Sequence, residues 1–294
     1  MIIKPLFGTI LAAALTVFAT SATAKSDCLD VGGVADADVQ RNAPIIASQS
    51  NLCISIVQSP ENGLPWQFLV IENTKRKKGP TVFLLHDNEQ AAFDTGLYSV
   101  MKYGGQLIAI EAGENREFKS QDPNRNFAET ANAAAPCRDM RTKPAPAFTK
   151  ALMDYRNRRD DFILTLHNNA NGHSGNGGSG AISAARESAV MKGLPAPNGG
   201  DEDDAVLMAG TVPFEQNNKA RDMTAKLHKQ GVNVIYEHVR PEKNDCSFSN
   251  YIVLNTDRQY FNIEAQHGHA ESQKRMLNLL MSQLKVRVVD KTMK

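Results

Sequence analysis

The sequence lacks a large net charge, a membrane-spanning apolar run and a Cys-x-x-Cys pair. Its formal net charge is +1, from 33 basic and 32 acidic residues. A chain without an excess of basic residues gives no reason to expect a nucleic-acid or membrane-surface partner. The apolar run at residues 10–19 is too short to cross a bilayer. No internal repeat is present, which argues against a solenoid or a propeller.

The amino terminus has the three parts of an export signal. Lys4 supplies the positive region, residues 10–19 the apolar region, and Ala22-Thr23-Ala24 a cleavage site of small residues. We expect the mature chain to begin near Lys25, to be periplasmic or secreted, and not to insert into the membrane once the signal is removed. Without Lys4, the basic and acidic residues balance.

Four cysteines, Cys28, Cys53, Cys137 and Cys246, lie in the exported part. An even number in an oxidising compartment predicts two disulfides rather than metal ligands. Three pairings are possible. We favour Cys28–Cys53 with Cys137–Cys246, because the first pair would tie down a loop-rich amino terminus.

The hydrophobic pattern alternates between strands and helices, which predicts a single α/β domain with a mixed, largely parallel central sheet flanked by helices. We expect a signal over residues 1–24, an irregular or hairpin extension over 25–65, and a catalytic domain over 66–294. The Gly-, Asn- and Ser-rich stretch over 168–204 predicts a functional or mobile loop. Predicted strands cover 51–57, 66–71, 81–85, 106–110, 161–166, 232–236 and 260–263, and predicted helices 90–103, 148–156, 214–230 and 272–284.

Several chemically active side chains follow predicted strands. His86 and Glu89 come after the apolar strand at 81–85, and His167 follows the strand at 161–166. Ligand crevices form at the carboxyl ends of strands in open α/β sheets. Two histidines and a carboxylate are a usual ligand set for a hydrolytic zinc. Histidines at strand ends also occur as ordinary structural residues, so the motif gains weight only from its neighbours.

Two further segments extend the pattern. Asp122-Pro123-Asn124-Arg125 brings a guanidinium, which can bind a carboxylate through two parallel hydrogen bonds. The same segment also fits an ordinary polar turn. Glu264 leaves an apolar strand, so we expect it to be partly desolvated and suited to accept a proton. Its alternative role is that of a salt-bridge partner.

Taken in this order, the motifs resemble those of the zinc carboxypeptidase family over roughly residues 66–286. They are His-x-x-Glu, then Asp-x-Asn-Arg-Asn-aromatic, then an apolar strand with His, then aromatic-x-apolar-Glu. The resemblance implies a mixed eight-stranded sheet flanked by helices and one zinc ion per chain. It implies that zinc is held by His86, Glu89 and His167, that Asn124 and Arg125 bind a substrate carboxylate, and that Glu264 is the general base.

The resemblance leaves other positions open. The arginine that faces the oxyanion corresponds to Arg116 or Lys119, and we favour Arg116, with Lys119 as a substrate-binding residue. The tyrosine that closes over the substrate corresponds best to Tyr236, with Tyr251 in reserve. Asp87, next to His86, is a candidate to orient the imidazole. Residues 244–248 replace the family's Gly-Ser-x-x-Asp-Trp stretch, which leaves the side-chain specificity pocket undefined.

Together these features predict a periplasmic zinc metallopeptidase that hydrolyses an amide bond next to a free carboxylate. Peptidoglycan stem peptides are the abundant substrates of that compartment, so we expect a carboxypeptidase or amidase acting on muropeptides. One alternative is an N-acyl amino acid deacylase resembling succinylglutamate desuccinylase and aspartoacylase, which share the metal motif but are usually cytosolic. Another is a non-catalytic, zinc-bearing module that binds peptide ends.

Overall fold

The computed structural model describes residues 28–61, 63–130, 137, 146–171, 181–184 and 204–293. The predicted signal and most of the stretch over 168–204 lie outside these residues. Among the described helices, none combines the length and the apolar character that a membrane span requires.

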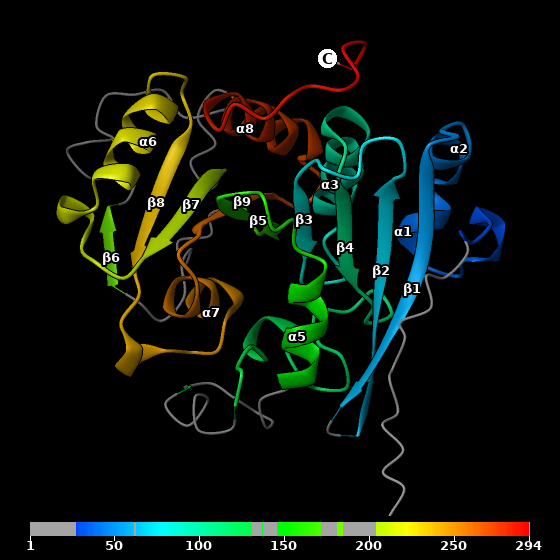
Figure 1. The fold of residues 1–294 in the computed structure, drawn as a ribbon, viewed down its shortest axis with the longest axis horizontal. Helices are drawn as coiled ribbons and strands as arrows, with labels where there is room; N and C mark the ends of the chain where they lie inside the picture. Colours follow the sequence, from blue (N-terminus) through cyan, green and yellow to red (C-terminus); the bar gives the residue numbers. More distant parts are fainter. Residues whose placement is uncertain are drawn as a thin grey trace, which may run out of the picture.

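A nine-stranded mixed sheet forms the centre of the described chain, in the order β1-β2-β4-β3-β5-β9-β7-β8-β6 (Figure 1). The middle of the sheet, from β4 through β3 and β5 to β9, is parallel, as predicted, and antiparallel pairs flank it. Antiparallel pairs join β1 to β2 and β6 to β8 at the two edges. The strands are β1 (Leu52–Glu61), β2 (Leu64–Asn73), β3 (Thr81–Leu84), β4 (Gln106–Ile110), β5 (Phe162–Asn169), β6 (Ala181–Ala184), β7 (Ala205–Gly210), β8 (Asn233–His238) and β9 (Gln259–Gln266).

Helices cover both faces of the sheet, so that the chain forms three layers. One face packs against α1 (Ala37–Arg41), α2 (Ala43–Ala47), α3 (Gln90–Tyr103), α6 (Asn218–His228) and α8 (Ala270–Gln283). The other face packs against α5 (Pro146–Asp154) and α7 (Phe248–Asn255). Short 3-10 turns are η1 (Val31–Gly33), η2 (Pro123–Arg125), η4 (Phe214–Gln216) and η5 (Pro241–Lys243).

The amino-terminal region is more ordered than the sequence suggested. Residues 37–47, expected to be irregular, form α1 and α2, whose Val39 and Ile46 are buried in the core. The predicted hairpin is present, and β1 pairs with β2 from Leu52 to Glu61. The extension therefore supplies the edge strand of the same sheet that carries the rest of the domain.

Besides α1 and α2, the sequence did not predict β6, β7 and α7. β7 is a short apolar run that is buried along its whole length, and α7 carries apolar residues without a clear polar face. Short apolar runs of this kind do not reveal by periodicity whether they form a strand or a helix. Both β7 and α7 border the cavity described below.

The end of α3 was predicted correctly. Gly104 and Gly105 have φ values of 78° and 76°, a backbone region that glycine enters without steric cost. A Cβ on Gly105 would also collide with the backbone of Gly79 and Pro80. The chain therefore leaves the helix sharply and enters β4, next to β3.

Both favoured disulfides are present. Cys28–Cys53 joins the amino-terminal segment to β1, with 5.0 Å between the Cα atoms. Cys137–Cys246 joins residue 137 to the loop before α7, with 5.4 Å between the Cα atoms. The second disulfide lies two residues before the start of α7, at the edge of the candidate active site.

Candidate active site

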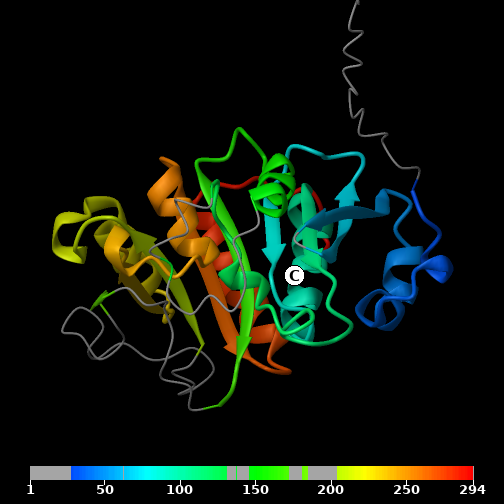
Figure 2. The same ribbon diagram turned by 90° about the horizontal axis from the view of Figure 1, so that it is seen from below.

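Three segments far apart in sequence meet at the carboxyl ends of the parallel strands. β3 ends at Leu84, His86 follows two residues later, and Glu89 is the N-cap residue of α3. β5 extends to Asn169, so that His167 lies within it and is paired in register with Glu264 of β9. Figure 2 shows β5 and β9 running side by side through the middle of the molecule.

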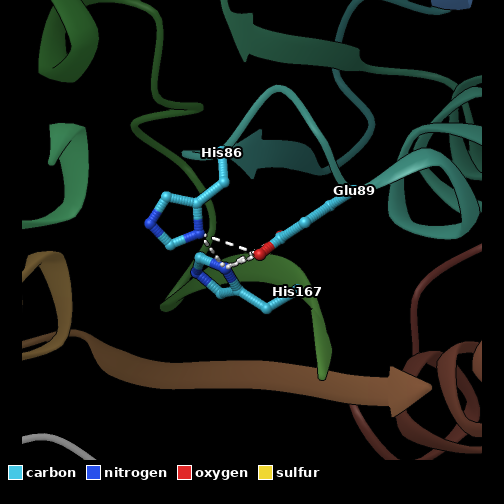
Figure 3. Close-up of side chains that lie close together, drawn as sticks. All are labelled: His86, Glu89 and His167. Atoms are coloured by element: carbon cyan, nitrogen blue, oxygen red, sulfur yellow. Dashed lines mark hydrogen bonds and ion pairs between the residues drawn. The ribbon is translucent and has the colours of Figure 1, made fainter. Parts of the chain in front are cut away.

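The side chains of His86, Glu89 and His167 point at one another (Figure 3). His86 Nδ1 lies 2.8 Å from Glu89 Oε1 and 3.1 Å from His167 Nδ1. His167 Nδ1 lies 3.0 Å from Glu89 Oε2. All three side chains are buried.

These distances fit a ligand set for a divalent metal ion. Ligand atoms at about 2.0–2.1 Å from a tetrahedral ion lie about 3.3 Å from one another. With Glu89 Oε1 as the single ligand oxygen, the three pairwise distances are 2.8, 3.1 and 3.4 Å, close to that edge length. Two imidazole nitrogens that face each other beside a carboxylate favour a cation between them, because both nitrogens present lone pairs when the rings are neutral.

Within the cluster, the Glu89 carboxylate and the His86 imidazole each stabilise the charged form of the other and so shift each other's pKa. Burial would raise the pKa of Glu89, but the neighbouring His167 and His86 outweigh it and lower this pKa to about 2. Burial would lower the pKa of His86, but the charge of Glu89 and hydrogen bonds to Asp122 and Glu89 raise it instead. Glu89 therefore remains ionised near neutral pH, as a metal ligand must be.

Asp122, rather than Asp87, orients His86. His86 Nε2 lies 3.0 Å from Asp122 Oδ1, and this contact holds the pKa of Asp122 well below its usual range despite burial. A proton on Nε2, donated to Asp122, leaves Nδ1 free to act as a ligand. The predicted role of Asp87 is wrong, because its Oδ2 instead accepts hydrogen bonds from the amides of Ala112 and Glu114.

A cavity of about 340 Å³ opens beside the cluster. It collects most of the side chains that the sequence singled out, from five different elements or loops. The predicted residues that line it are His86, Glu89, Arg116, Asn124, Arg125, His167 and Glu264.

Arg125 is held at the cavity wall by its surroundings. Its Nε lies 3.6 Å from Asp245 Oδ2, and its Nη1 donates to the carbonyl of Asn124 at 2.8 Å. Asn124 Oδ1 accepts from the amide of Phe248, which connects η2 to the start of α7. The guanidinium is partly exposed toward the cavity and remains positioned to bind an anion.

Of the two candidates for the oxyanion cation, only Arg116 reaches the cluster. Its Nη1 lies 3.3 Å from His86 Nδ1 and 3.6 Å from Glu89 Oε1, and its side chain is half exposed. Lys119 is exposed outside the cavity, with its Nζ 5.6 Å from the centroid of the Phe118 ring. The structure thus places Arg116, and not Lys119, at the site.

Glu264 lies one strand away from the cluster. Its backbone is opposite His167 in the β5–β9 ladder, and its carboxylate lines the cavity. Asn262 Nδ2 donates to Glu264 Oε1 at 2.7 Å, and the two residues lie on the same face of β9. The side chain is half-buried, in keeping with the partial desolvation expected from the sequence.

The prediction for Tyr236 is wrong. Tyr236 points to the opposite face of the sheet, where it packs in the core against Phe214. Its hydroxyl donates to the carbonyl of Val212 at 2.7 Å. Tyr251 does not line the cavity either, and its hydroxyl bonds Glu129 instead.

Sequence reasoning missed several residues on the cavity wall. Tyr260 and Asn262 precede Glu264 at two-residue spacing on β9, a period that places all three on one face. Glu237 follows Tyr236 directly and therefore faces the cavity that Tyr236 does not reach. The others are Asn88, Asn168, Asn169, Ala170, Leu207, Ser247 and Ser249.

No protein-family model and no curated protein matches the sequence. The fold is similar to several solved structures. A protein from Shewanella amazonensis, provisionally described as a metallopeptidase, is 13% identical with a TM-score of 0.46, over 84% of this chain and 93% of the other.

Two further solved structures show comparable similarity. An aspartoacylase family protein from Mesorhizobium loti is 13% identical with a TM-score of 0.45, over 83% of this chain and 69% of the other. A metallo-carboxypeptidase from Burkholderia cenocepacia is 12% identical with a TM-score of 0.42, over 84% of this chain and 68% of the other.

Proposed function

We propose that this chain is an exported, zinc-dependent hydrolase that cleaves an amide bond next to a free carboxylate. One observation carries the proposal. The cluster of His86, Glu89 and His167 shares a single cavity with a half-buried carboxylate, Glu264, and a partly exposed guanidinium, Arg125. This combination offers a metal site, a base and an anchor for a carboxylate.

The ligand set of two imidazoles and one carboxylate suits zinc, which would polarise the scissile carbonyl and acidify a water molecule when bound. Within this proposal, Arg125 binds the free carboxylate and fixes the position of the substrate. Glu264 takes the proton of the attacking water and delivers it to the leaving amine. Arg116, beside the cluster, stabilises the negative charge that develops on the carbonyl oxygen.

Peptidoglycan stem peptides are the substrate class we propose, with the enzyme acting as a carboxypeptidase or amidase. The predicted export signal and the two disulfides support an oxidising compartment outside the cytoplasm. The deacylase alternative would use the same metal site on small N-acyl amino acids. A panel that contains both classes, assayed with and without a chelator, separates the two.

The decisive variants are Glu264→Gln and His167→Ala. Glu264→Gln retains bound zinc but lowers kcat by about 10²–10⁴-fold, the usual contribution of a general base. His167→Ala loses the metal as well as the activity. Glu271→Gln, on an exposed side chain of α8, is the matched control and leaves both quantities unchanged. Full activity of Glu264→Gln, or cleavage that persists after complete metal removal, would contradict the proposal.

A further inference from the structure

The amino-terminal turn of α3 starts at a residue whose side chain faces the candidate metal site. Glu89 is the N-cap residue of α3, and its carbonyl accepts the first intrahelical hydrogen bond, from the amide of Phe93 at 3.0 Å. An N-cap side chain usually accepts from one of the amides of the first turn. The carboxylate of Glu89 instead turns toward His86 and His167 (Figure 3). The amides at the start of α3 therefore need an acceptor from another part of the chain.

Asn168 of β5 supplies this acceptor. Its Oδ1 accepts from the amide of Ala92, the third residue of α3, at 3.1 Å. This amide is one of the two that a side chain at the N-cap position itself would reach. Asn168 is buried, and it follows His167 directly in β5. A strand residue thus caps the helix from outside, and the N-cap residue keeps its carboxylate for the histidines.

The amide nitrogen of Asn168 fixes the orientation of the same side chain. Nδ2 donates to the carbonyl of His167 and to that of Ala265, each at 3.2 Å. An amide oxygen cannot replace Nδ2 there, because both partners are acceptors. Ala265 follows Glu264 on β9. This side chain therefore connects the segments that carry Glu89, His167 and Glu264.

The connection to α3 is the one for which Asn168 matters most. β5 and β9 are already paired along their length, and Gln273 of α8 joins them again, with Nε2 2.8 Å from the carbonyl of His167 and 2.9 Å from that of Ile263. Loss of Asn168 would leave these contacts in place. It would leave the buried amide of Ala92 without its acceptor, which is destabilising. The consequence falls on the first turn of α3, and hence on the carboxylate that this turn carries.

We propose that Asn168 is a positioning residue that caps α3 in place of Glu89 and thereby holds the Glu89 carboxylate beside His167 for metal binding. Any shift of the helix start relative to β5 would change the separation of this carboxylate and the His167 imidazole. Contacts that orient the ligands of a metal site raise its affinity. This inference rests on the proposed function, because it takes the three clustered side chains to be zinc ligands.

The first test compares Asn168→Leu with Asn73→Leu in a competition assay with a zinc chelator. Asn73 is the matched control, because it is also buried and bonds the other end of α3, where its Nδ2 donates to the carbonyl of Val100 and its Oδ1 accepts from the amide of Arg76. Asn168→Leu is expected to weaken zinc binding by about 10–100-fold, the usual effect of losing a contact that orients a ligand. Asn73→Leu is expected to destabilise the fold to a similar degree but to change zinc affinity less than about threefold.

A second measurement needs neither zinc nor activity. Hydrogen exchange of the metal-free protein reports the protection of individual backbone amides. Asn168→Leu is expected to accelerate exchange at Ala92 by about tenfold relative to Asn73→Leu, since loss of one hydrogen bond has an effect of this size. Asn168→Asp keeps the acceptor but not the two donors, so it is expected to retain slow exchange at Ala92 and to lose less zinc affinity than Asn168→Leu. This variant keeps the test decisive if the leucine variant does not fold.

The outcomes separate this inference from the proposed function. Unchanged zinc affinity in Asn168→Leu, or exchange at Ala92 that is equally fast in Asn168→Asp and Asn168→Leu, would overturn the role of Asn168. If the wild type binds zinc with both effects present but hydrolyses no peptide, the hydrolase proposal fails and the positioning role is supported. If the wild type binds no zinc, the proposed function fails, and the exchange result alone decides whether Asn168 caps the helix.

Discussion

Asp122 and Asp87 illustrate how little sequence proximity says about the contacts of a single side chain. Asp87 follows His86 directly, yet its carboxylate bonds the amides of Ala112 and Glu114 and so supports the loop that leads to Arg116. Asp122 is 36 residues away from His86 and contacts its Nε2. The Asp122-Pro123-Asn124-Arg125 motif was recognised in the sequence. However, Asp-Pro-Asn is also an ordinary turn, so the contact of Asp122 with His86 was not predicted.

Asp122→Asn is expected to weaken zinc binding by about 10–100-fold, because it removes the acceptor that orients the imidazole of His86. Competition with a zinc chelator measures the dissociation constant directly. Asp87→Asn is the matched comparison and is expected to change this constant much less. A larger loss of zinc affinity in Asp87→Asn than in Asp122→Asn would show that the contact between His86 and Asp122 is unimportant.

A second residue-scale prediction concerns Glu111, which lies in a group of carboxylates with Asp36 and Asp87. Burial, and then the charges of Asp36 and Asp87, raise the pKa of Glu111 from 4.5 to about 9. The folded protein therefore keeps a proton that the unfolded chain releases above about pH 4.5. The free energy of unfolding consequently falls as the pH rises through this window.

Glu111→Gln removes this titration, so the variant is expected to be more stable than the wild type by on the order of 1–3 kcal/mol at pH 8. The difference shrinks toward zero near pH 4. Urea unfolding at a series of pH values measures it. The exposed Glu114 provides a control, and Glu114→Gln is expected to retain the wild-type dependence on pH. A difference that grows toward low pH would have the wrong sign and refute the prediction.

At the scale of elements, the loop before α7 links the second disulfide to Arg125, the proposed substrate anchor. Asp245 contacts Arg125, the carbonyl of Cys246 accepts from the amide of Phe127, and the amide of Phe248 donates to Asn124. Cys246 also forms the disulfide with Cys137. The position of Arg125 therefore depends on a loop that a covalent bond restrains.

Replacing both Cys137 and Cys246 with serine is expected to raise KM more than it lowers kcat, because in the proposed mechanism Arg125 binds substrate rather than reacting with it. The paired control replaces Cys28 and Cys53, at the other end of the sheet. Each pair of substitutions is expected to cost about 2–4 kcal/mol of stability, but only the first raises KM. Steady-state kinetics well below both melting temperatures compares them, and equal KM values would contradict the link.

The sequence predicted a strand at β8 but not which of its residues face the cavity. All of Asn233 to Glu237 are buried, so the alternation of polar and apolar residues that normally marks a face is absent. Tyr236 and Glu237 point to opposite faces, and a choice between adjacent residues required the ladder with β7.

At the scale of the whole molecule, the candidate metal site joins His86 and His167, which lie 81 residues apart in the sequence. A ligand that binds only when these segments meet stabilises the folded state. Zinc at a hundred times its dissociation constant is expected to increase the free energy of unfolding by about 2.7 kcal/mol. For a domain of this size, such an increase raises Tm by roughly 5–10 °C. Scanning calorimetry measures the shift.

His86→Ala and His167→Ala are each expected to abolish this zinc-dependent increase in Tm. The exposed His267, which lines the cavity but is not among the three clustered donors, is the control. His267→Ala is expected to retain the increase. A shift that survives in both ligand variants would place the stabilising zinc elsewhere on the protein.

The sequence by itself determined the α/β class, most of the helices and strands, and the segments that supply the cavity, and it favoured the disulfide pairing that the structure shows. Such features are local or depend on residue type: apolar periodicity, glycine stops, and histidines and acids placed at strand ends. Tertiary structure alone decided that Arg116 rather than Lys119 reaches the cluster, that Asp122 bonds His86, and that Glu237 rather than Tyr236 faces the cavity. The physical reason is that these choices depend on sheet register and on loop paths between distant segments, and neither is encoded within a short stretch of sequence.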